Sequence, residues 1–284
     1  VERKAKAIQF RNYNIIPSKS FYLSNFNYDK NLLTDKLLNF SQDTLVIRIK
    51  GNKSGLEKKD LAFLDLLQKG NWERPIYFNN TSLNGIGLDL RRNVVQEGFV
   101  YRLLPIQNTS SSNFIDTDKM YSNLMEKSFW RGLDNENAYF SEDHRGFIMN
   151  YRSTFNTLIK NLIDENRYDD ALKVINKCLE VMPDKSLMYD HFSVQIVEYL
   201  IDLNQKADLN TMNLANEIAE LTSVRADETL NYYFDNGIKN RYEIQRNLVS
   251  LNTLARAYSK TDKQDLSKKY RELFENNYSR SSIN

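Results

Sequence analysis

Cysteine and histidine are scarce in this chain. One cysteine, Cys178, and two histidines, His144 and His191, occur among 284 residues. A single thiol excludes an intrachain disulfide, so packing has to stabilise the fold. The histidines lie far apart in the sequence, and no Cys or His stands near them at the spacing of a zinc site. We therefore expect no metal and no other cofactor, and we assign both histidines to surface or capping positions.

Glycine, proline and long apolar runs are also scarce. Nine glycines and four prolines argue against a turn-rich all-β protein and against a long disordered tail. The longest apolar runs are only a handful of residues, whereas about 20 are needed to span a bilayer. The sequence therefore predicts no membrane span in these residues.

No excess of one charge sign is present. The 39 basic and 37 acidic residues leave a formal net charge of +2, and the two signs are interspersed. Nucleic-acid-binding proteins instead gather basic residues on one face, so we expect no nucleic-acid partner. The length and the apolar content of 41% allow a substantial core and favour about two domains.

Residues 1–112 alternate strand and helix patterns, which is typical of a small α/β domain with a mixed sheet. The helix expected over 57–69 has a broad apolar face, as crossover helices between strands have. A shorter helix is expected over 87–95. Strands that are parallel neighbours should be joined by right-handed crossovers. The expected strands cover residues 7–13, 20–23, 44–50, 75–78 and 99–105.

Residues 113–284 form the second predicted domain, which is all-helical and follows a polar linker over 108–113. When Pro183 is aligned with the closing proline of a tetratricopeptide unit, large and small side chains fall where that repeat requires them. Small side chains at two of these positions would let the second helix lie against the first. The matching residues are Phe155, Leu158, Leu162, Ala171, Ile175 and Cys178.

The later helices match the repeat less well, so we predict one good repeat inside an irregular stack of helical hairpins. Such a stack normally presents a groove that holds a peptide or a protein segment. The alternative is that these helices only brace the α/β domain. The later helices are expected over 187–204, 210–224, 227–236, 241–259 and 263–278. Aromatic residues that could line a groove, or pack half-buried instead, are Tyr199, Tyr232, Tyr233, Phe234, Tyr242 and Tyr258.

A helix-to-strand corner holds the most specific pattern in the chain. The helix over 57–69 stops at Gly70-Asn71, and a short strand begins at Pro75, where a missing N–H is tolerated. The end of the helix and the start of the strand account for the glycine, the proline and the apolar residues that follow, but they do not require Trp72 and Arg74. The stretch from Trp72 to Phe78 resembles the Trp-x-Arg-Pro-Ile-Tyr-Phe signature of a family of multi-pass membrane proteins. That family is common in Bacteroidetes and is similar to protein O-mannosyltransferases, which are glycosyltransferases of the GT-C type.

Further segments resemble the same family in the same order: 16–23, 45–49, 96–106, 121–125 and 145–152. The resemblance implies that this chain is the soluble C-terminal region of such a protein, with a tetratricopeptide-like last part. It also implies a periplasmic location and attachment to a membrane portion whose loops carry the reacting carboxylates. The chain opens on Val1 beside a basic cluster and has no apolar signal segment, so we expect an excised piece of a longer protein.

The family-like segments suggest a candidate binding patch at one end of the sheet. Trp72, Arg74, Glu97, Tyr101 and Arg102 could form a polar, aromatic-lined surface suited to a sugar or to the membrane portion of the parent. The alternative is a structural tie, in which Trp72 covers the end of the sheet and Arg74 pairs with a carboxylate such as Glu97. No acid/base pair accompanies these residues in the sequence, so we assign them no catalytic role.

Asp116 and Asp118 form a second candidate site. The stretch Phe114-Ile115-Asp116-Thr117-Asp118 is similar to the Asp-x-Asp element with which many nucleotide-sugar transferases hold Mg²⁺ or Mn²⁺. The alternative is that Thr117 and Asp118 cap the following helix and supply its acidic first turn. We favour the cap, because the element does not end a strand of an evident nucleotide-binding fold.

These patterns lead to one expected function and two alternatives. We expect an extracytoplasmic part of a membrane-embedded glycosyltransferase-like protein, which is not catalytic itself and recognises an acceptor protein or another partner. A purely structural protein interaction module without a glycan role is the first alternative. The second is a metal-dependent nucleotide-sugar transferase that uses Asp116 and Asp118.

Overall fold

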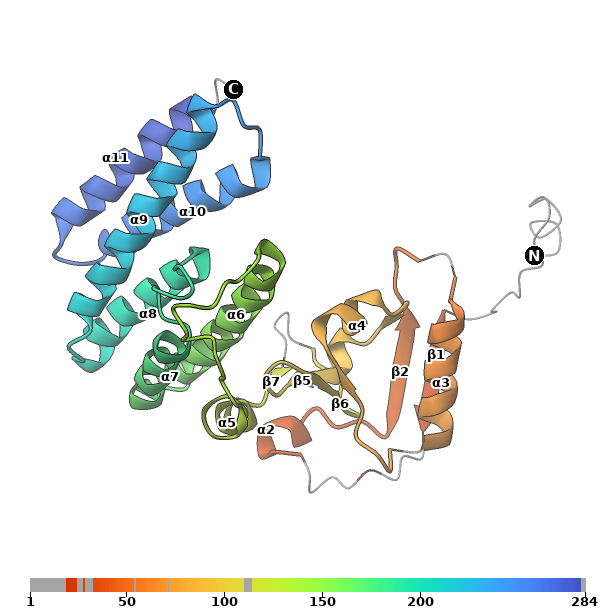
Figure 1. Ribbon diagram of the computed structural model, residues 1–284. Helices are drawn as coiled ribbons and strands as arrows, with labels where there is room; N and C mark the ends of the chain where they lie inside the picture. The colour runs from red at the N-terminus through yellow and green to blue at the C-terminus, as the bar shows by residue number, and fades with distance from the viewer. Residues whose placement is uncertain are drawn as a thin grey trace. The chain divides into compact units, whose positions relative to one another are not determined.

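The computed structural model describes residues 19–24, 28, 33–53, 55–70, 72–109 and 114–281. The chain divides into two compact units, Val1–Asp116 and Thr117–Asn284, and Figure 1 labels the elements of both. The sequence placed this boundary at residue 112. The strand expected over 7–13 lies outside the described residues. The predicted fold class, a small mixed α/β part followed by an all-helical part, is confirmed.

The described strands of the first unit form two small sheets. In one sheet the order is β1-β2-β4, with β1 at Ser20–Ser24, β2 at Thr44–Ile49 and β4 at Leu88–Asp89. In the other the order is β3-β6-β5-β7. All described neighbours are antiparallel except β5 and β7. The strands of the second sheet are Tyr77–Phe78 (β3), Val94–Gln96 (β5), Tyr101–Leu103 (β6) and Phe114–Ile115 (β7).

The helix expected over 57–69 is present as α3, Lys58–Gly70. It packs Phe63, Leu64 and Leu67 against the strand residues Leu45 and Ile47. However, α3 connects β2 to β3, which lie in different sheets. The expected parallel crossover within one sheet is therefore wrong for this helix. Two short helices, Asp35–Leu38 (α2) and Asn80–Gly85 (α4), complete the described helical part of this unit.

The helix expected over 87–95 is wrong. The structure has β4, a short 3-10 turn at Arg91–Asn93 and β5 in its place. Val94 packs into the core around Leu45, and Val95 packs into a different core around Leu104. Successive side chains of a strand point to opposite faces, so β5 buries both of its faces. This demand, together with the β-branched valines, overrides the short helical pattern.

The second unit is a stack of helices, coloured from yellow-green to violet in Figure 1. After α5 (Thr117–Ser122) and a π-helical turn at Asn123–Lys127 come successive hairpins in which α6 contacts α7, α8 contacts α9 and α10 contacts α11. The first helices of the hairpins also contact one another in the order α6, α8, α10. Their bounds are Glu142–Asp164 (α6), Tyr168–Val181 (α7), His191–Ala207 (α8), Met212–Asp235 (α9), Arg241–Tyr258 (α10) and Gln264–Ser281 (α11).

The apolar positions of the proposed repeat form the core of the first hairpin. All are buried to within 1% of complete burial: Phe155, Leu158, Leu162, Ala171, Ile175 and Cys178. Burial raises the pKa of the Cys178 thiol to about 12. A thiol this deep and this weakly acidic serves as a small core side chain between the helices.

The two helices expected over 210–224 and 227–236 are one continuous helix, α9. No glycine or proline interrupts this stretch, and Ser223, Ala226 and Leu230 are all buried on it. The start of α8 is also later than expected, at His191 rather than at residue 187. Within the described residues, no helix is long and apolar enough to cross a membrane.

Candidate functional site

The patch predicted at the end of the sheet is split between two faces. Arg102 lies opposite Tyr77 and Val95 in the strand pairing, whereas Tyr101 lies opposite Phe78 and Gln96. Because side chains alternate along a strand, Tyr101 and Arg102 point to opposite sides of the second sheet. Tyr101 packs against the core around Leu45, and burial raises the pKa of its hydroxyl.

Glu97 and Arg102 form the polar centre of this region. The Arg102 Nη1 and Glu97 Oε1 atoms are 3.6 Å apart, and the side chains are only 12% and 6% exposed. The Tyr77 hydroxyl donates to Glu97 Oε2 over 3.5 Å. Glu97 also lies in the turn between β5 and β6, where its N–H donates to the carbonyl oxygen of Val100. These contacts tie β3, β5 and β6 together and leave little of the ion pair available to a ligand.

Arg74 does not take the position expected of the tie, whereas Trp72 packs against the core that contains the strand residues. Arg74 is exposed, and the structure pairs Glu97 with Arg102, so the suggested pair between Arg74 and Glu97 is wrong. Trp72 is half-buried against the core around Leu45, to which both sheets contribute, and its ring meets that of Tyr28 edge-on at 6.2 Å. Its φ of 63° lies in the left-handed region, which is unusual for a bulky residue and marks a strained corner.

Asp116 and Asp118 do not act as a pair. Asp116 is buried, and its N–H donates to the carbonyl oxygen of Gln96. Asp118 lies in the first turn of α5, as the capping interpretation predicts, and is 82% exposed. The Arg167 guanidinium contacts Asp118 at 2.6 Å. In the part of the chain that the structure describes, no group of three or more His, Cys, Asp and Glu side chains could hold a metal ion.

The helical unit offers a different site, on the face shared by α6, α8 and α10. Polar side chains join these helices across the face. Asn156 donates to Gln195 Oε1 at 2.9 Å, and Arg256 donates to Glu198 Oε1 at 3.3 Å. These contacts join helices that are far apart in the sequence. Asn156 is buried between α6 and α8, whereas the Arg256 side chain is exposed.

A pocket of about 360 Å³ opens on this face. We call it the Tyr199 pocket. Its size is in the range of small ligand sites, and its lining is mostly polar, with charges of both signs. The residues that line it are Lys160, Ile163, Asp164, Gln195, Glu198, Tyr199, Asp202 and Lys260.

Tyr199 is the aromatic centre of this pocket. Burial and the nearby carboxylates Glu198, Asp164 and Asp202 raise the pKa of the Tyr199 hydroxyl to about 12. The phenol therefore stays protonated and can donate or accept a hydrogen bond at neutral pH. Lys160 contacts Asp164 at 2.8 Å. An aromatic ring among alternating charges suits recognition of a polar chain rather than proton transfer.

The other aromatic candidates divide into three groups. Tyr233 and Phe234 line a second pocket at the end of α9. Tyr258 belongs to the core, is fully buried and donates its hydroxyl proton to Asn216 Oδ1 at 2.7 Å. Tyr232 and Tyr242 are 59% and 69% exposed.

Sequence reasoning named Tyr199 but missed the charged residues around it. One signal was present in the sequence: Gln195, Tyr199 and Asp202 recur at helical spacing and form a polar stripe on α8. Lys160 comes from α6 and Lys260 from the turn after α10, and only the packing brings them to this stripe.

Comparison with known proteins gives a match to a family model. No curated protein and no solved structure matches the chain. Residues 1–123 match the family model of TMEM260-associated domain 2, a domain named after a membrane protein that resembles protein O-mannosyltransferases.

Proposed function

We propose that this chain is the extracytoplasmic recognition part of a membrane-embedded, glycosyltransferase-like protein, and that it holds a segment of an acceptor protein in the Tyr199 pocket. The match of residues 1–123 to a domain associated with such a membrane protein supports the assignment to this class. The extracytoplasmic location and the membrane-bound parent follow from the resemblance of the corner signature. The chain itself is proposed to be non-catalytic.

The observation that carries the recognition role is the Tyr199 pocket on the face of α6, α8 and α10. Lys260 can meet a carboxylate of an extended segment. Lys160, Glu198 and Asp202 are paired with Asp164, Arg256 and Lys206, and they can exchange these partners for charges or amide N–H groups of the segment. The tyrosine ring offers a rigid apolar surface at low entropic cost. The lining comes from α6, α8 and the turn after α10, so the pocket can contact a peptide over several residues.

Sugar transfer by the intact gene product tests this proposal. In the variant Tyr199→Ala, the KM for the acceptor protein should rise by about tenfold, which is the effect of losing roughly 1.4 kcal/mol of binding. The kcat at saturating acceptor should stay unchanged, because the reacting groups are proposed to lie elsewhere. Tyr139→Ala removes an equally large, exposed aromatic ring that lines neither pocket and serves as the matched control.

Two outcomes would contradict the proposal. Robust sugar transfer from a lipid-linked or nucleotide-linked donor by the isolated chain would show that the chain is catalytic. An unchanged acceptor KM in Tyr199→Ala would remove the pocket from acceptor recognition and favour the purely structural interaction module.

A further inference from the structure

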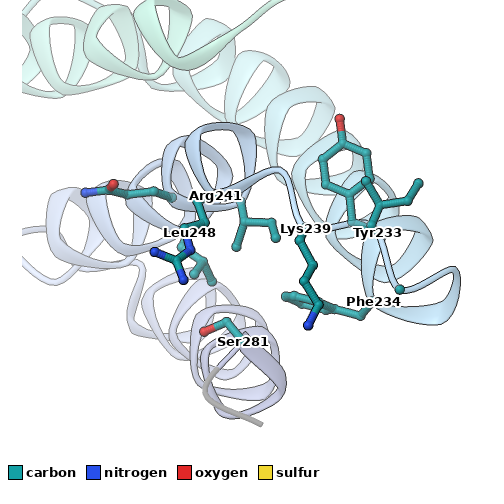
Figure 2. Close-up of a pocket in the computed structure, with 10 residues that line it drawn as sticks. Tyr233, Phe234, Lys239, Arg241, Leu248 and Ser281 are labelled. Carbon is teal, nitrogen blue, oxygen red and sulfur yellow. The ribbon is translucent and has the colours of Figure 1, made fainter. Parts of the chain in front are cut away.

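A second pocket of the helical unit lies at the turn between α9 and α10, and we call it the α9–α10 pocket. Its volume is about 360 Å³, and Figure 2 shows the side chains that surround it. They come from the end of α9, the turn, the first half of α10 and the end of α11. The α9–α10 pocket shares no lining residue with the Tyr199 pocket.

The walls of the α9–α10 pocket combine apolar and polar side chains. Phe234 and Leu248 are buried members of the core between α9 and α10, and Ile244 packs against the same core. Ile238 in the turn is 36% exposed. The pocket is therefore an opening at the end of an apolar core. A bulky aliphatic or aromatic side chain that fills it buries its apolar surface against this core.

Two cations line the same pocket. Figure 2 shows Lys239 and Arg241 beside it, together with Ser281 of α11. Two acidic residues of these helix ends are engaged elsewhere, because Asp235 contacts Arg280 at 2.5 Å and Glu243 contacts Arg246 at 2.7 Å. Among the described residues, neither Lys239 nor Arg241 has an ion-pair partner. The positive N-terminal end of α10, which begins at Arg241, adds to this field.

The polar lining favours a peptide over a hydrocarbon chain. Gln245 also lines the pocket, and its amide group can donate to and accept from a peptide backbone. Exposed aromatic residues continue on the same helix ends, with Tyr232 on α9 and Tyr278 on α11. Tyrosine and arginine are the residues that protein interfaces favour.

We propose that the α9–α10 pocket binds an acidic peptide segment of a partner protein, with a bulky apolar side chain in the pocket and adjacent carboxylates on Lys239 and Arg241. This site is independent of the proposed acceptor role of the Tyr199 pocket. Either proposal can fail while the other holds.

Selection from a library of random peptides displayed on phage, against the immobilised full chain, tests this inference. Enriched peptides should carry a bulky apolar residue next to Asp or Glu. A synthetic fluorescent copy of the consensus should bind about tenfold more weakly to the double variant Lys239→Glu/Arg241→Glu, and its affinity for the unchanged chain should fall with added salt. Fluorescence anisotropy measures both effects.

Matched variants serve as controls for this test. Lys263→Glu/Arg271→Glu makes the same charge change at exposed residues of the last hairpin that do not line the pocket, and it should leave binding unchanged. Ile238→Ser should weaken binding without a change of charge. Circular dichroism should show the same helix content in all three variants, since the substituted residues are exposed.

Three results would overturn the inference. The selection could yield no acidic, apolar consensus. The consensus peptide could bind the Lys239→Glu/Arg241→Glu variant as well as the unchanged chain. Decanoate, a hydrocarbon anion without a peptide backbone, could bind in the pocket where no peptide does.

Discussion

Arg152 shows at the residue scale how one buried charge can shape a loop. Its guanidinium, 3% exposed, donates to the carbonyl oxygens of Met182, Leu187 and Met188 and contacts Asp190 at 3.2 Å. These carbonyl groups belong to the loop between α7 and α8. Because the carbonyl oxygens of Leu187 and Met188 accept hydrogen bonds from Arg152, this segment stays a loop. The helix α8 starts only after Asp190, whose side chain caps it. A charge buried this deeply is stabilised by its full set of partners.

His191 is the residue at which we expect a pH effect. Burial lowers its pKa, and Arg246 lowers it further, while Asp190 acts in the opposite direction. The Arg246 Nη2 atom lies 2.8 Å from His191 Nδ1, so protonation of the ring would place two cations together. The native state therefore resists protonation that the unfolded chain accepts.

The expected result is a loss of stability as the pH falls from about 7 to about 5.5, because the unfolded chain then binds more protons than the folded one. Urea denaturation at several pH values measures the free energy of unfolding. His191→Gln keeps an acceptor for Arg246 and should remove most of this slope, whereas His144→Gln, at an exposed position of α6, should keep it. An equal slope in both variants would assign the effect to carboxylates instead.

At the scale of elements, Asp60 joins α3 to the first sheet. Its buried carboxylate accepts the Gly87 N–H at 2.7 Å and the Glu57 N–H at 2.8 Å. The second contact caps the start of α3, in the manner of a capping box. The contact with the Gly87 N–H holds α3 close to the start of β4. A Cβ atom added to Gly87 would lie 2.6 Å from Asp60 Oδ2. This close approach explains the glycine at position 87.

Substitution of these two residues should destabilise the first unit. We expect Asp60→Ala to lower the free energy of unfolding by about 1–3 kcal/mol for each N–H left buried and unsatisfied. Gly87→Ala should cost on the order of 1–3 kcal/mol through overpacking. Gly51→Ala introduces a Cβ with nothing within 4 Å and should change stability by less than about 0.5 kcal/mol. Thermal and urea denaturation measure all three, and equal stabilities of the Gly87→Ala and Gly51→Ala variants would disprove the close-packing account.

The elements also show where sequence patterns succeed. The helix α3 and the first hairpin of the helical unit follow from apolar spacing, because one face of each must be buried whatever the neighbours are. The segment 87–95 does not, because its valines serve two cores in a short central strand. The division of α9 into two helices was also wrong. The polar stretch around Arg225 stays helical, because its side chains find partners that are distant in the sequence. Arg225 pairs there with Asp184, which lies in the loop between α7 and α8.

At the scale of the whole molecule, the second unit includes α5. Thr117 Oγ1 donates to Glu165 Oε1 at 2.8 Å, and Met120 is fully buried. The matched family model ends at residue 123, whereas the unit begins at Thr117. The segment 117–123 therefore belongs to the matched sequence and to the helical unit at the same time.

Truncation at these two positions tests this division. We expect a fragment 117–284 to be helical and to unfold cooperatively, with a higher Tm than a fragment 124–284. Loss of a buried methionine and its neighbours should cost about 2–5 kcal/mol, and each kcal/mol corresponds to about 2–4 °C at this size. Circular dichroism during heating measures the difference. Equal Tm values would place α5 outside the stabilising core of the helical unit.

The sequence by itself determined the division into a mixed part and a helical part, the positions of the main helices and the buried stripe from Phe155 to Cys178. Periodicity is local, so a single chain segment carries it. Only the tertiary structure decided that Glu97 pairs with Arg102, that Lys260 joins Lys160 at Tyr199, and that Lys239 and Arg241 share a pocket with Ser281. These meetings depend on how strands pair and helices pack, and that geometry is fixed by the whole core rather than by any one segment.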